Sequence, residues 1–426
     1  MIQHWRRKLL LGGAALLVEA ALLGAGAQAG VRPGDVISAQ DADRVKDLVS
    51  PGVLYMVKHD MRMNIVPTER VDWPPPYTEA TEKYSSQVSL DSAHRSLVGY
   101  VAGQPFPLID VNDPYAATKI IWNNVFRPAG SDDYDLRFFD CPSEYVSPGR
   151  SRRVVERIVV GHYAGYNLVG RTEVEPLPAD PDFKQSNRLW LFALYPILAP
   201  AEDRGDGLIR FRYADPNRGD DSWTWSPGSR RVRRLDESIL STASSAQTHD
   251  ADHYSGFNPK TEQYDYRFLG EKEMLGCVHA IHSPEVTCPY DGGASACPEN
   301  WELRHMYVVE ATPRRDVGQA SRALDSRTVV YLDSEVWFEP YIDTYDRRGQ
   351  LWRTHIYWLT YRDRPVPDAR VAVYPFKREF IVGAGSYDVQ GGYASMCYLP
   401  GQQTPERECW YITMGAVDKQ FCTVEA

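Results

Sequence analysis

The chain has 426 residues and a mass of 48.3 kDa, with 43% hydrophobic, 24% charged and 12% aromatic residues. This composition excludes an intrinsically disordered chain and a protein with many membrane-spanning helices, and the 26 Tyr and 11 Trp favour β-structure. The formal net charge of −10 argues against a general nucleic-acid binder, because such proteins need surplus Lys and Arg to neutralise phosphates.

Residues 1–29 have the pattern of an export signal. Basic residues 6–8 precede an apolar run over residues 9–18, and residues 27–29 (Ala-Gln-Ala) are typical of a signal-peptidase site. An uncleaved membrane anchor is the alternative, and it is less favoured because Glu19 interrupts the apolar stretch. The sequence therefore predicts export, with cleavage near Ala29.

The next region, residues 30–150, is expected to hold helices and short strands. A strand pair is predicted around Tyr84–Leu90 and Ser96–Val101. Asp113 and Pro114 predict the start of a helix, because Asp caps free amides and Pro fits the first turn. This helix is apolar on most of its circumference, so we expect it to be well buried.

From about Val154 the pattern changes to strands, with β-branched and aromatic runs separated by Gly, Pro or Asp. Short links between the runs are typical of antiparallel neighbours. The expected strands are Val154–Tyr163, Tyr166–Val174, Arg188–Leu198, Leu208–Tyr213, Ser222–Trp225, Arg304–Thr312, Arg327–Leu332, Val336–Tyr345 and Leu351–Tyr361. So many strands predict a mainly β, α+β fold built on one large curved antiparallel sheet.

We expect a single domain over residues 30–426. Its main sheet would occupy residues 151–361, and residues 362–426 would form a Cys-containing C-terminal tail. Several strands are apolar on both faces. One face can pack on helices, and the other face must then be covered by a ligand, a lid or a partner. Two interpretations stay open: the chain fills the concave face itself, or a ligand cavity lies there.

Candidate lining residues of such a cavity are Trp190, Phe192, Trp223, Trp225, Trp337, Phe338, Trp352, Tyr357 and Trp358. No more than about half of them can contact a ligand, because alternate side chains of a strand point to opposite faces.

A hairpin over residues 223–235 carries four arginines on its return strand. Strand alternation places Arg230 and Arg234 on one face and Arg231 and Arg233 on the other. These arginines are candidates for binding an anionic headgroup or an acidic partner. The alternative is a solvated sheet edge that is charged to prevent aggregation.

The seven cysteines fit an oxidising compartment. Six of them are disulfide candidates: Cys277, Cys288, Cys297, Cys397, Cys409 and Cys422. Their clustering suggests local bridges such as Cys288–Cys297 and Cys397–Cys409, with Cys141 left unpaired, although sequence alone fixes no connectivity.

The sequence motifs give little support to a metal site or a catalytic site. The run Cys277-Val278-His279-Ala280-Ile281-His282 has ligand types suited to zinc, but its spacing matches no common zinc module. His249 and His253 lie in a polar stretch that is typical of a solvated loop. Nucleophile-elbow, zinc-protease and P-loop motifs are absent from the sequence. We therefore predict no catalytic residue, no cofactor and no metal site.

Several motifs together resemble the domain-of-unknown-function family 1329, within a superfamily of outer-membrane lipoprotein-sorting-like proteins. They are the Trp-x-Trp-x-Pro…Arg-Arg-x-Arg-Arg run at 223–234, Gly-Gln-Pro-Phe-Pro at 103–107, the 264–274 segment, Tyr-Val-Val-Glu-Ala-Thr at 307–312, and the 345–353 segment. This resemblance implies a periplasmic protein with an incomplete β-barrel whose apolar concave side is partly closed by helices. A cysteine-bearing insertion at 277–299 and the tail from 391 depart from the family pattern.

In the wider superfamily, relatives carry the acyl chains of lipoproteins or other lipids. The resemblance therefore implies a non-enzymatic periplasmic carrier or chaperone for a hydrophobic ligand, with an efflux-type inner-membrane transporter and an outer-membrane barrel protein as partners. The alternative is a structural or assembly protein that docks on such a transporter or barrel. A periplasmic hydrolase is a third hypothesis, and it predicts a polar cleft with perturbed carboxylates.

Overall fold

The computed structural model describes residues 30–128, 130–146, 153–235, 252–281, 298–364, 373–399 and 411–412. The expected export signal at residues 1–29 lies outside these ranges, as do Cys288, Cys297, Cys409 and Cys422. Among the described residues, no helix is long and apolar enough to cross a bilayer.

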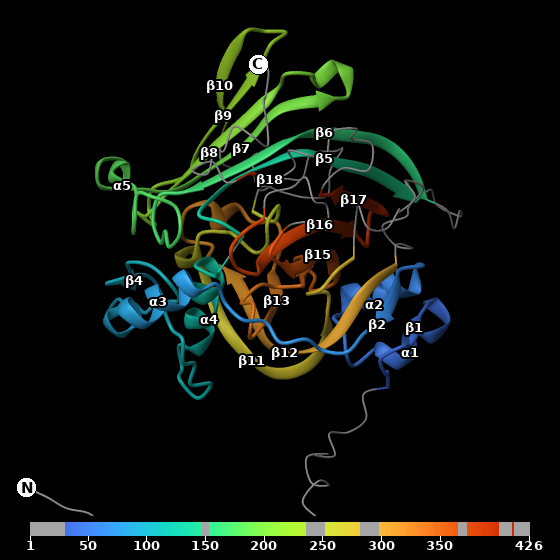
Figure 1. The fold of residues 1–426 in the computed structure, drawn as a ribbon. Helices are drawn as coiled ribbons and strands as arrows, with labels where there is room; N and C mark the ends of the chain where they lie inside the picture. The colour runs from blue at the N-terminus through green and yellow to red at the C-terminus, as the bar shows by residue number, and fades with distance from the viewer. Residues whose placement is uncertain are drawn as a thin grey trace, which may run out of the picture.

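One large, strongly curved sheet dominates the molecule (Figure 1). Its strands are β1 (Val36–Ile37), β2 (Arg62–Ile65), β5 (Asp133–Val146), β6 (Arg153–Asn167), β7 (Arg188–Ala199), β8 (Gly207–Tyr213), β9 (Asp221–Ser226), β10 (Arg231–Leu235), β11 (Tyr264–Gly276), β12 (Pro298–Pro313), β13 (Arg327–Asp333), β14 (Tyr341–Tyr345), β15 (Leu351–Arg362), β16 (Arg378–Asp388), β17 (Tyr393–Tyr398) and β18 (Tyr411–Ile412). A separate small sheet pairs β3 (Ser89–Leu90) with β4 (Leu97–Val98).

The strand order is β1-β2-β12-β13-β14-β15-β16-β17-β5-β6-β7-β8-β9-β10, with β11 paired to β12 and β18 to β5. All pairs are antiparallel except β2 with β12. Within the described residues β10 pairs only with β9 and β11 only with β12, so the sheet does not close on itself. The predicted fold class, a large curved sheet that forms an incomplete barrel, is confirmed.

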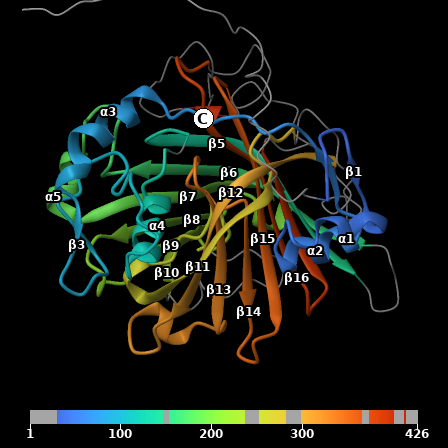
Figure 2. The ribbon, with the colours of Figure 1, turned by 90° about the horizontal axis from the view of Figure 1, so that it is seen from below.

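Two groups of strands meet where β17 pairs with β5. Strands β11–β17 are sequence neighbours, and so are β5–β10, but the join brings Ser395 opposite Ser143 and Tyr398 opposite Asp140. In Figure 2, β5–β10 and β13–β16 run in crossing directions. The two groups therefore form two walls of one bent sheet.

Helices cover the sheet from both sides. They are α1 (Ala42–Val45), α2 (Pro51–Lys58), α3 (Pro75–Tyr84), α4 (Ala116–Val125) and α5 (Pro181–Ser186), with 3-10 turns at Ala39–Asp41, Ser85–Gln87, Ala201–Asp203 (η3), Thr261–Gln263 and Gln319–Arg322. Helix α2 packs Val53 and Met56 into a core that includes Trp358. Helix α4 packs Ile120 and Ile121 into a second core.

The first turn of α2 shows how a helix is fixed to the sheet. Ser50 accepts a hydrogen bond from the Val53 amide, and Pro51 occupies the first turn. The Asp343 carboxylate accepts hydrogen bonds from the Ser50 hydroxyl at 3.0 Å and the Gly52 amide at 2.9 Å. A β-carbon at position 52 would lie 2.3 Å from the Asp343 side chain, so only glycine permits this approach.

Most predicted elements are present, with shifted boundaries. The predicted helix at Asp113 begins at Ala116 with Tyr115 as its N-cap residue. The Asp113 carboxylate accepts a hydrogen bond from the Tyr115 amide at 2.7 Å, so Asp113 stabilises the turn before the helix and does not cap it. Residues 84–87 are helical rather than extended. The predicted strand Tyr166–Val174 is wrong, because β6 runs on to Asn167 and irregular chain follows.

The main sheet also extends beyond the predicted range of 151–361. Strands β5, β16 and β17 lie outside it, so residues 362–426 are not merely a tail. The predicted strand Val336–Tyr345 begins only at Tyr341, since residues 336–340 turn the chain between β13 and β14.

The disulfide prediction needs correction. Cys141 is not the unpaired cysteine; it forms a disulfide with Cys397 across the β5–β17 join. Cys397 therefore does not pair with Cys409. Cys277, a predicted disulfide candidate, is a buried free thiol that donates to the Asn300 carbonyl at 3.0 Å. Sequence clustering misled here because the cysteines that meet are 256 residues apart and come together only through sheet pairing.

Replacing Cys141 and Cys397 together with Ser is expected to lower the free energy of unfolding by about 2–4 kcal/mol, because the unfolded chain loses a constraint on a long loop. Denaturant unfolding of the double variant measures this loss. Peptide mapping without reductant should find one cross-linked pair containing these two cysteines, and a Cys277→Ala variant should retain it. A Cys397–Cys409 cross-link in its place would contradict the structure.

Candidate functional site

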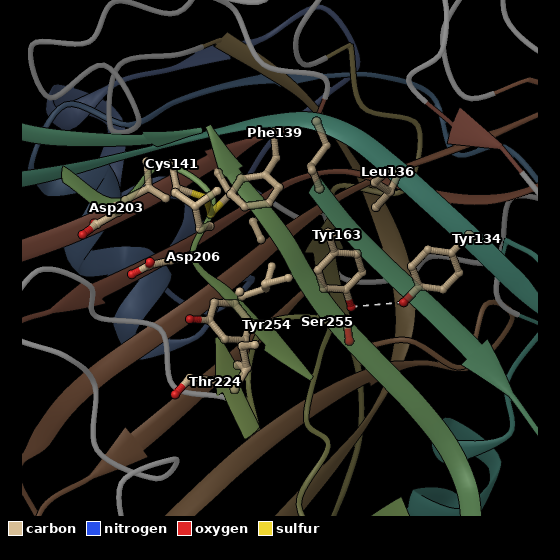
Figure 3. Close-up of a pocket in the computed structure, with 18 of the residues that line it drawn as sticks. Tyr134, Leu136, Phe139, Cys141, Tyr163, Asp203, Asp206, Thr224, Tyr254 and Ser255 are labelled. Atoms are coloured by element: carbon tan, nitrogen blue, oxygen red, sulfur yellow. Dashed lines mark hydrogen bonds between the residues drawn. A yellow bond between two sulfur atoms is a disulfide. The ribbon is translucent and has the colours of Figure 1, made fainter. Parts of the chain in front are cut away.

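A cavity of about 640 Å³ lies on the inner side of the bent sheet, between β5–β10 and β16 (Figure 3). Its volume falls within the range of small-molecule pockets. Most of its wall is aliphatic or aromatic. The apolar wall residues include Leu136, Phe139, Val159, Leu194, Ile197, Leu208, Phe380, Ile381, Ala384 and Leu399, together with the Cys141–Cys397 disulfide.

Strand register places one line of side chains across this wall. Leu136 of β5 lies opposite Tyr163 of β6, and Tyr163 lies opposite Leu194 of β7. Leu194 lies opposite Leu208 of β8, and Leu208 lies opposite Thr224 of β9. Residues that lie opposite each other in an antiparallel pair share a face of the sheet. The five side chains therefore form one row, and all of them line the cavity.

Two tyrosines place hydroxyl groups in the otherwise apolar wall. The Tyr134 hydroxyl donates to the Tyr163 hydroxyl at 3.1 Å (Figure 3), and their rings stack at 5.5 Å. The Tyr134 ring lies directly on Gly165, where an added β-carbon would come within 2.5 Å of it. Burial raises the pKa of Tyr163, so its hydroxyl stays protonated. It can therefore donate to or accept from a bound molecule.

An ion pair between half-buried Arg127 and buried Glu379 forms part of the cavity wall. Arg127 and Glu379 approach to 3.6 Å, and the Arg127 guanidinium also donates to the Ser255 carbonyl at 3.2 Å. Burial raises the pKa of Glu379 to about 7, the nearby Glu339 carboxylate raises it further, and Arg127 opposes the shift. Glu379 is thus the wall residue whose charge changes near neutral pH.

The cavity opens toward solvent where its wall residues become exposed, and we call this end the mouth. Half-buried Asp203 and Asp206 lie there, with exposed Arg231 and Arg233 of β10. Arg157 forms an ion pair with Asp203. Arg234 instead pairs with Asp221, and Arg230 lies in the β9–β10 turn. Arg231 and Arg233 therefore lie on the cavity face of β10 and Arg234 on the other face, as strand alternation predicts, whereas Arg230 precedes the strand and its face is not set by alternation.

The nine candidate lining residues lie in different places. Trp225 is part of the cavity wall. Trp190 and Phe192 line a second cavity of about 180 Å³, and Trp352 lines a third of about 60 Å³. Trp223 packs against Phe211. Four are buried in the cores, namely Trp337, Phe338, Tyr357 and Trp358. Whether any of the nine contacts a ligand stays a prediction.

Sequence reasoning missed most of the wall, including every residue that β5, β6 and β16 contribute to it. It searched for the largest aromatic side chains, whereas medium-sized residues such as Leu136 and Val159 leave the space open. Val159 and Tyr163 do lie within a predicted strand, on one face at even spacing. This even spacing is the feature of the sequence that could have identified the two residues as part of one wall.

The candidate metal-binding residues are not brought together in the part of the chain that the structure describes, where no group of three His, Cys, Asp or Glu could hold an ion. His279 bonds to the Glu302 carboxylate at 2.7 Å, and the His253 ring stacks on that of His355 at 4.4 Å. His249 and His282 lie outside the described residues.

Comparison with known proteins identifies relatives. The model of a family described as protein of unknown function, DUF1329, matches residues 36–410. The uncharacterised protein PA3922 of Pseudomonas aeruginosa is 24% identical over 359 residues, which cover 79% of this chain and 71% of that protein. The resemblance to family 1329 noted in the sequence is confirmed.

Solved structures give more distant similarities. A domain from Vibrio parahaemolyticus named for outer membrane lipoprotein sorting is 13% identical, with a TM-score of 0.45, and covers 71% of this chain and 93% of that one. A DUF1329 family protein from Desulfovibrio piger is 12% identical, with a TM-score of 0.40, and covers 63% and 84%. A LolA superfamily protein from Nitrosomonas europaea is 12% identical, with a TM-score of 0.35, and covers 66% and 90%.

Replacing Glu379 with Gln is expected to reduce the pH dependence of stability. The pKa of Glu379 in the folded protein lies above its ordinary value of 4.5, so its contribution to stability is complete below about pH 4.5 and is lost as pH rises through about 7. The wild type should lose up to about 3 kcal/mol more than the variant between pH 5 and pH 8. Denaturant unfolding at both pH values measures the difference.

The exposed Glu271→Gln variant is the control, and it should behave as the wild type. Identical losses in the wild type and the Glu379→Gln variant would show that Glu379 is ionised throughout this range.

Proposed function

The chain belongs to the DUF1329 family, a family of unknown function, and we propose that it is a non-enzymatic periplasmic carrier that holds a lipid or similar hydrophobic molecule in the cavity of its incomplete barrel. The observation that supports this proposal is the apolar cavity of about 640 Å³ on the inner side of the sheet. Much of its apolar wall, including Leu136, Phe139 and Phe380, belongs to one of the two hydrophobic cores, so the cavity is continuous with the interior of the protein.

The energetics suit an alkyl chain. Burying each methylene contributes ~0.8 kcal/mol, so a chain of ordinary lipid length gains useful affinity without any specific polar contact. Wall residues such as Leu194 and Leu208 offer this apolar surface. Binding to the wall also removes these side chains from water, so the empty and loaded states differ mainly in exposed apolar area.

The polar groups of the cavity suit binding rather than bond cleavage. Arg157 is paired with Asp203, and Arg127 with Glu379. The Tyr134 and Tyr163 hydroxyls bond to each other. A hydrolase would need a nucleophile or paired carboxylates aimed at a substrate, and the paired groups described here already hold one another.

The export-signal pattern supports the proposed location, and the resemblance to family 1329 supports the proposed partners. The export-signal pattern of residues 1–29 supports a periplasmic location after cleavage near Ala29. A carrier there would receive its cargo from one envelope protein and deliver it to another. An efflux-type inner-membrane transporter and an outer-membrane barrel protein are the partners that we propose.

One observation favours the alternative of a structural or assembly protein. Tyr195 lies against Gly207, which is paired with Trp225, and Trp225 is paired with Val232. Tyr195 and Val232 are 58% and 63% exposed. This apolar row could contact a partner protein. A pull-down from detergent-solubilised envelopes discriminates the two functions, because a scaffold holds its partner equally well when no cargo is bound.

Replacing Leu208 with Trp is expected to block the cavity, because Leu208 lies in the middle of the wall row and a larger side chain occupies the space of a ligand. The affinity for a fluorescent fatty-acid analogue should fall about tenfold or more. Lipid extraction and mass spectrometry of the protein purified from its own compartment should show less bound hydrophobe than in the wild type.

The adjacent Ile209→Trp substitution is the matched control, because Ile209 is half-buried in the same strand on the opposite face. It should bind the analogue as the wild type does. A wild type that binds no analogue and purifies without any hydrophobe would refute the carrier function.

A further inference from the structure

The row of wall residues changes from apolar to charged toward the sheet edge. It begins with Leu136 and Tyr163, continues through Leu194 and Leu208 to the Thr224 hydroxyl, and ends at Arg233, which lies opposite Thr224 (Figure 3 shows Leu136, Tyr163 and Thr224). A molecule lying along this row would meet hydrocarbon at one end and a guanidinium at the other.

A second pair repeats the pattern at the mouth. Arg231 lies opposite Ser226, and both line the cavity. Arg231 and Arg233 are two residues apart in β10, which puts their side chains on the same face about 6.6 Å apart along the strand. Two guanidinium groups and two hydroxyls therefore face one small region of the mouth.

These two arginines carry uncompensated charge. In the part of the chain that the structure describes, neither Arg231 nor Arg233 forms an ion pair, and both are exposed. The other charged wall residues near them are Arg157, which Asp203 neutralises, and Asp206. Arg157, Arg231 and Arg233 thus outnumber Asp203 and Asp206 among the residues that line the mouth, and Glu202, which lies 3.9 Å from Arg157, acts on Arg157 rather than on the two arginines of β10.

We propose that the cavity binds an amphiphile with an anionic headgroup, a carboxylate or a phosphate, whose alkyl chain lies along the apolar row and whose headgroup is bound by Arg231 and Arg233. This inference rests on the proposed carrier function and names its ligand class. Guanidinium groups match carboxylate and phosphate oxygens with paired hydrogen bonds, and Thr224 and Ser226 add hydroxyl donors beside them. The headgroup stays at the exposed end, so its charge is never fully removed from water.

The experiment separates the tail from the headgroup. Delipidated full-length secreted protein is loaded with the neutral dye Nile red, which is displaced with myristate, tetradecyl phosphate or 1-tetradecanol below their aggregation limits. Acetate and inorganic phosphate test the anion alone. The wild type should bind the two anionic amphiphiles about tenfold or more tightly than the alcohol, and added NaCl should reduce this preference.

The Arg231→Gln/Arg233→Gln variant should lose the preference, with all three tailed ligands bound within about threefold of one another and the alcohol unchanged. The matched control is Arg230→Gln/Arg234→Gln, which removes the same charge from two arginines of the same hairpin that do not line the cavity. The control should keep the wild-type preference.

Four outcomes would overturn the inference. Equal wild-type affinity for the alcohol and the anionic amphiphiles would do so while leaving the carrier function intact. An equal loss of the preference for anionic amphiphiles in the two double variants would show a general effect of net charge. Inorganic phosphate bound as tightly as tetradecyl phosphate would show an anion site independent of the cavity. Failure of every tailed ligand to bind would remove the carrier function itself, and the headgroup inference with it.

Discussion

The pairing of β17 with β5 is the contact on which the rest of the molecule depends. Without it, β5–β10 and β11–β17 would be two separate sheets, each with an unpaired inner edge. Antiparallel hydrogen bonds and the Cys141–Cys397 disulfide join them into one bent wall. The cavity lies against this join, and both cysteines are part of its lining. The space for a ligand is therefore a product of the same contact that holds the fold together.

Side-chain size explains why one part of the bend is filled and another is open. Large aromatic residues such as Trp301 and Trp358 are completely buried in the core beside α2. On the cavity wall, aliphatic residues such as Leu136, Val159 and Leu194 alternate with smaller rings such as Tyr163, and β6 contains Gly161 and Gly165. The rings of Phe139 and Tyr134 lie over these glycines and form part of the wall. The fold thus packs tightly against its helices while keeping its concave side accessible.

The sequence predicted the architecture better than the site. Runs of β-branched and aromatic residues bounded by Gly, Pro or Asp, such as those of β7, β8 and β15, locate strands correctly, since these residue types favour extended chain even where both faces are apolar. Strand alternation underlies the correct division of the arginines in β10 between two faces. Family resemblance led to the incomplete barrel, which local patterns alone do not distinguish from other curved sheets.

The remaining features depend on contacts between distant parts of the chain. No local pattern indicates that Cys141 meets Cys397, or that Phe380 and Phe139 face the same space. Glu379 is an ordinary acidic residue in the sequence, and only burial beside Arg127 and Glu339 changes its behaviour. Aromatic residues were the natural candidates for the wall, yet Phe338 and Tyr357 are core residues because the segment that contains residue 253 covers them.

The position of β17 near the end of the chain has a consequence for biosynthesis. A ribosome makes β5 long before β17, because the cysteines that join them are 256 residues apart. Until β17 pairs with β5, wherever the chain folds, β5 has an unpaired strand edge beside an apolar surface, a combination that is prone to aggregation. Pairing of two strands that are so far apart in the sequence is also slow. The unfinished protein, rather than the finished one, is therefore the form that most needs a chaperone.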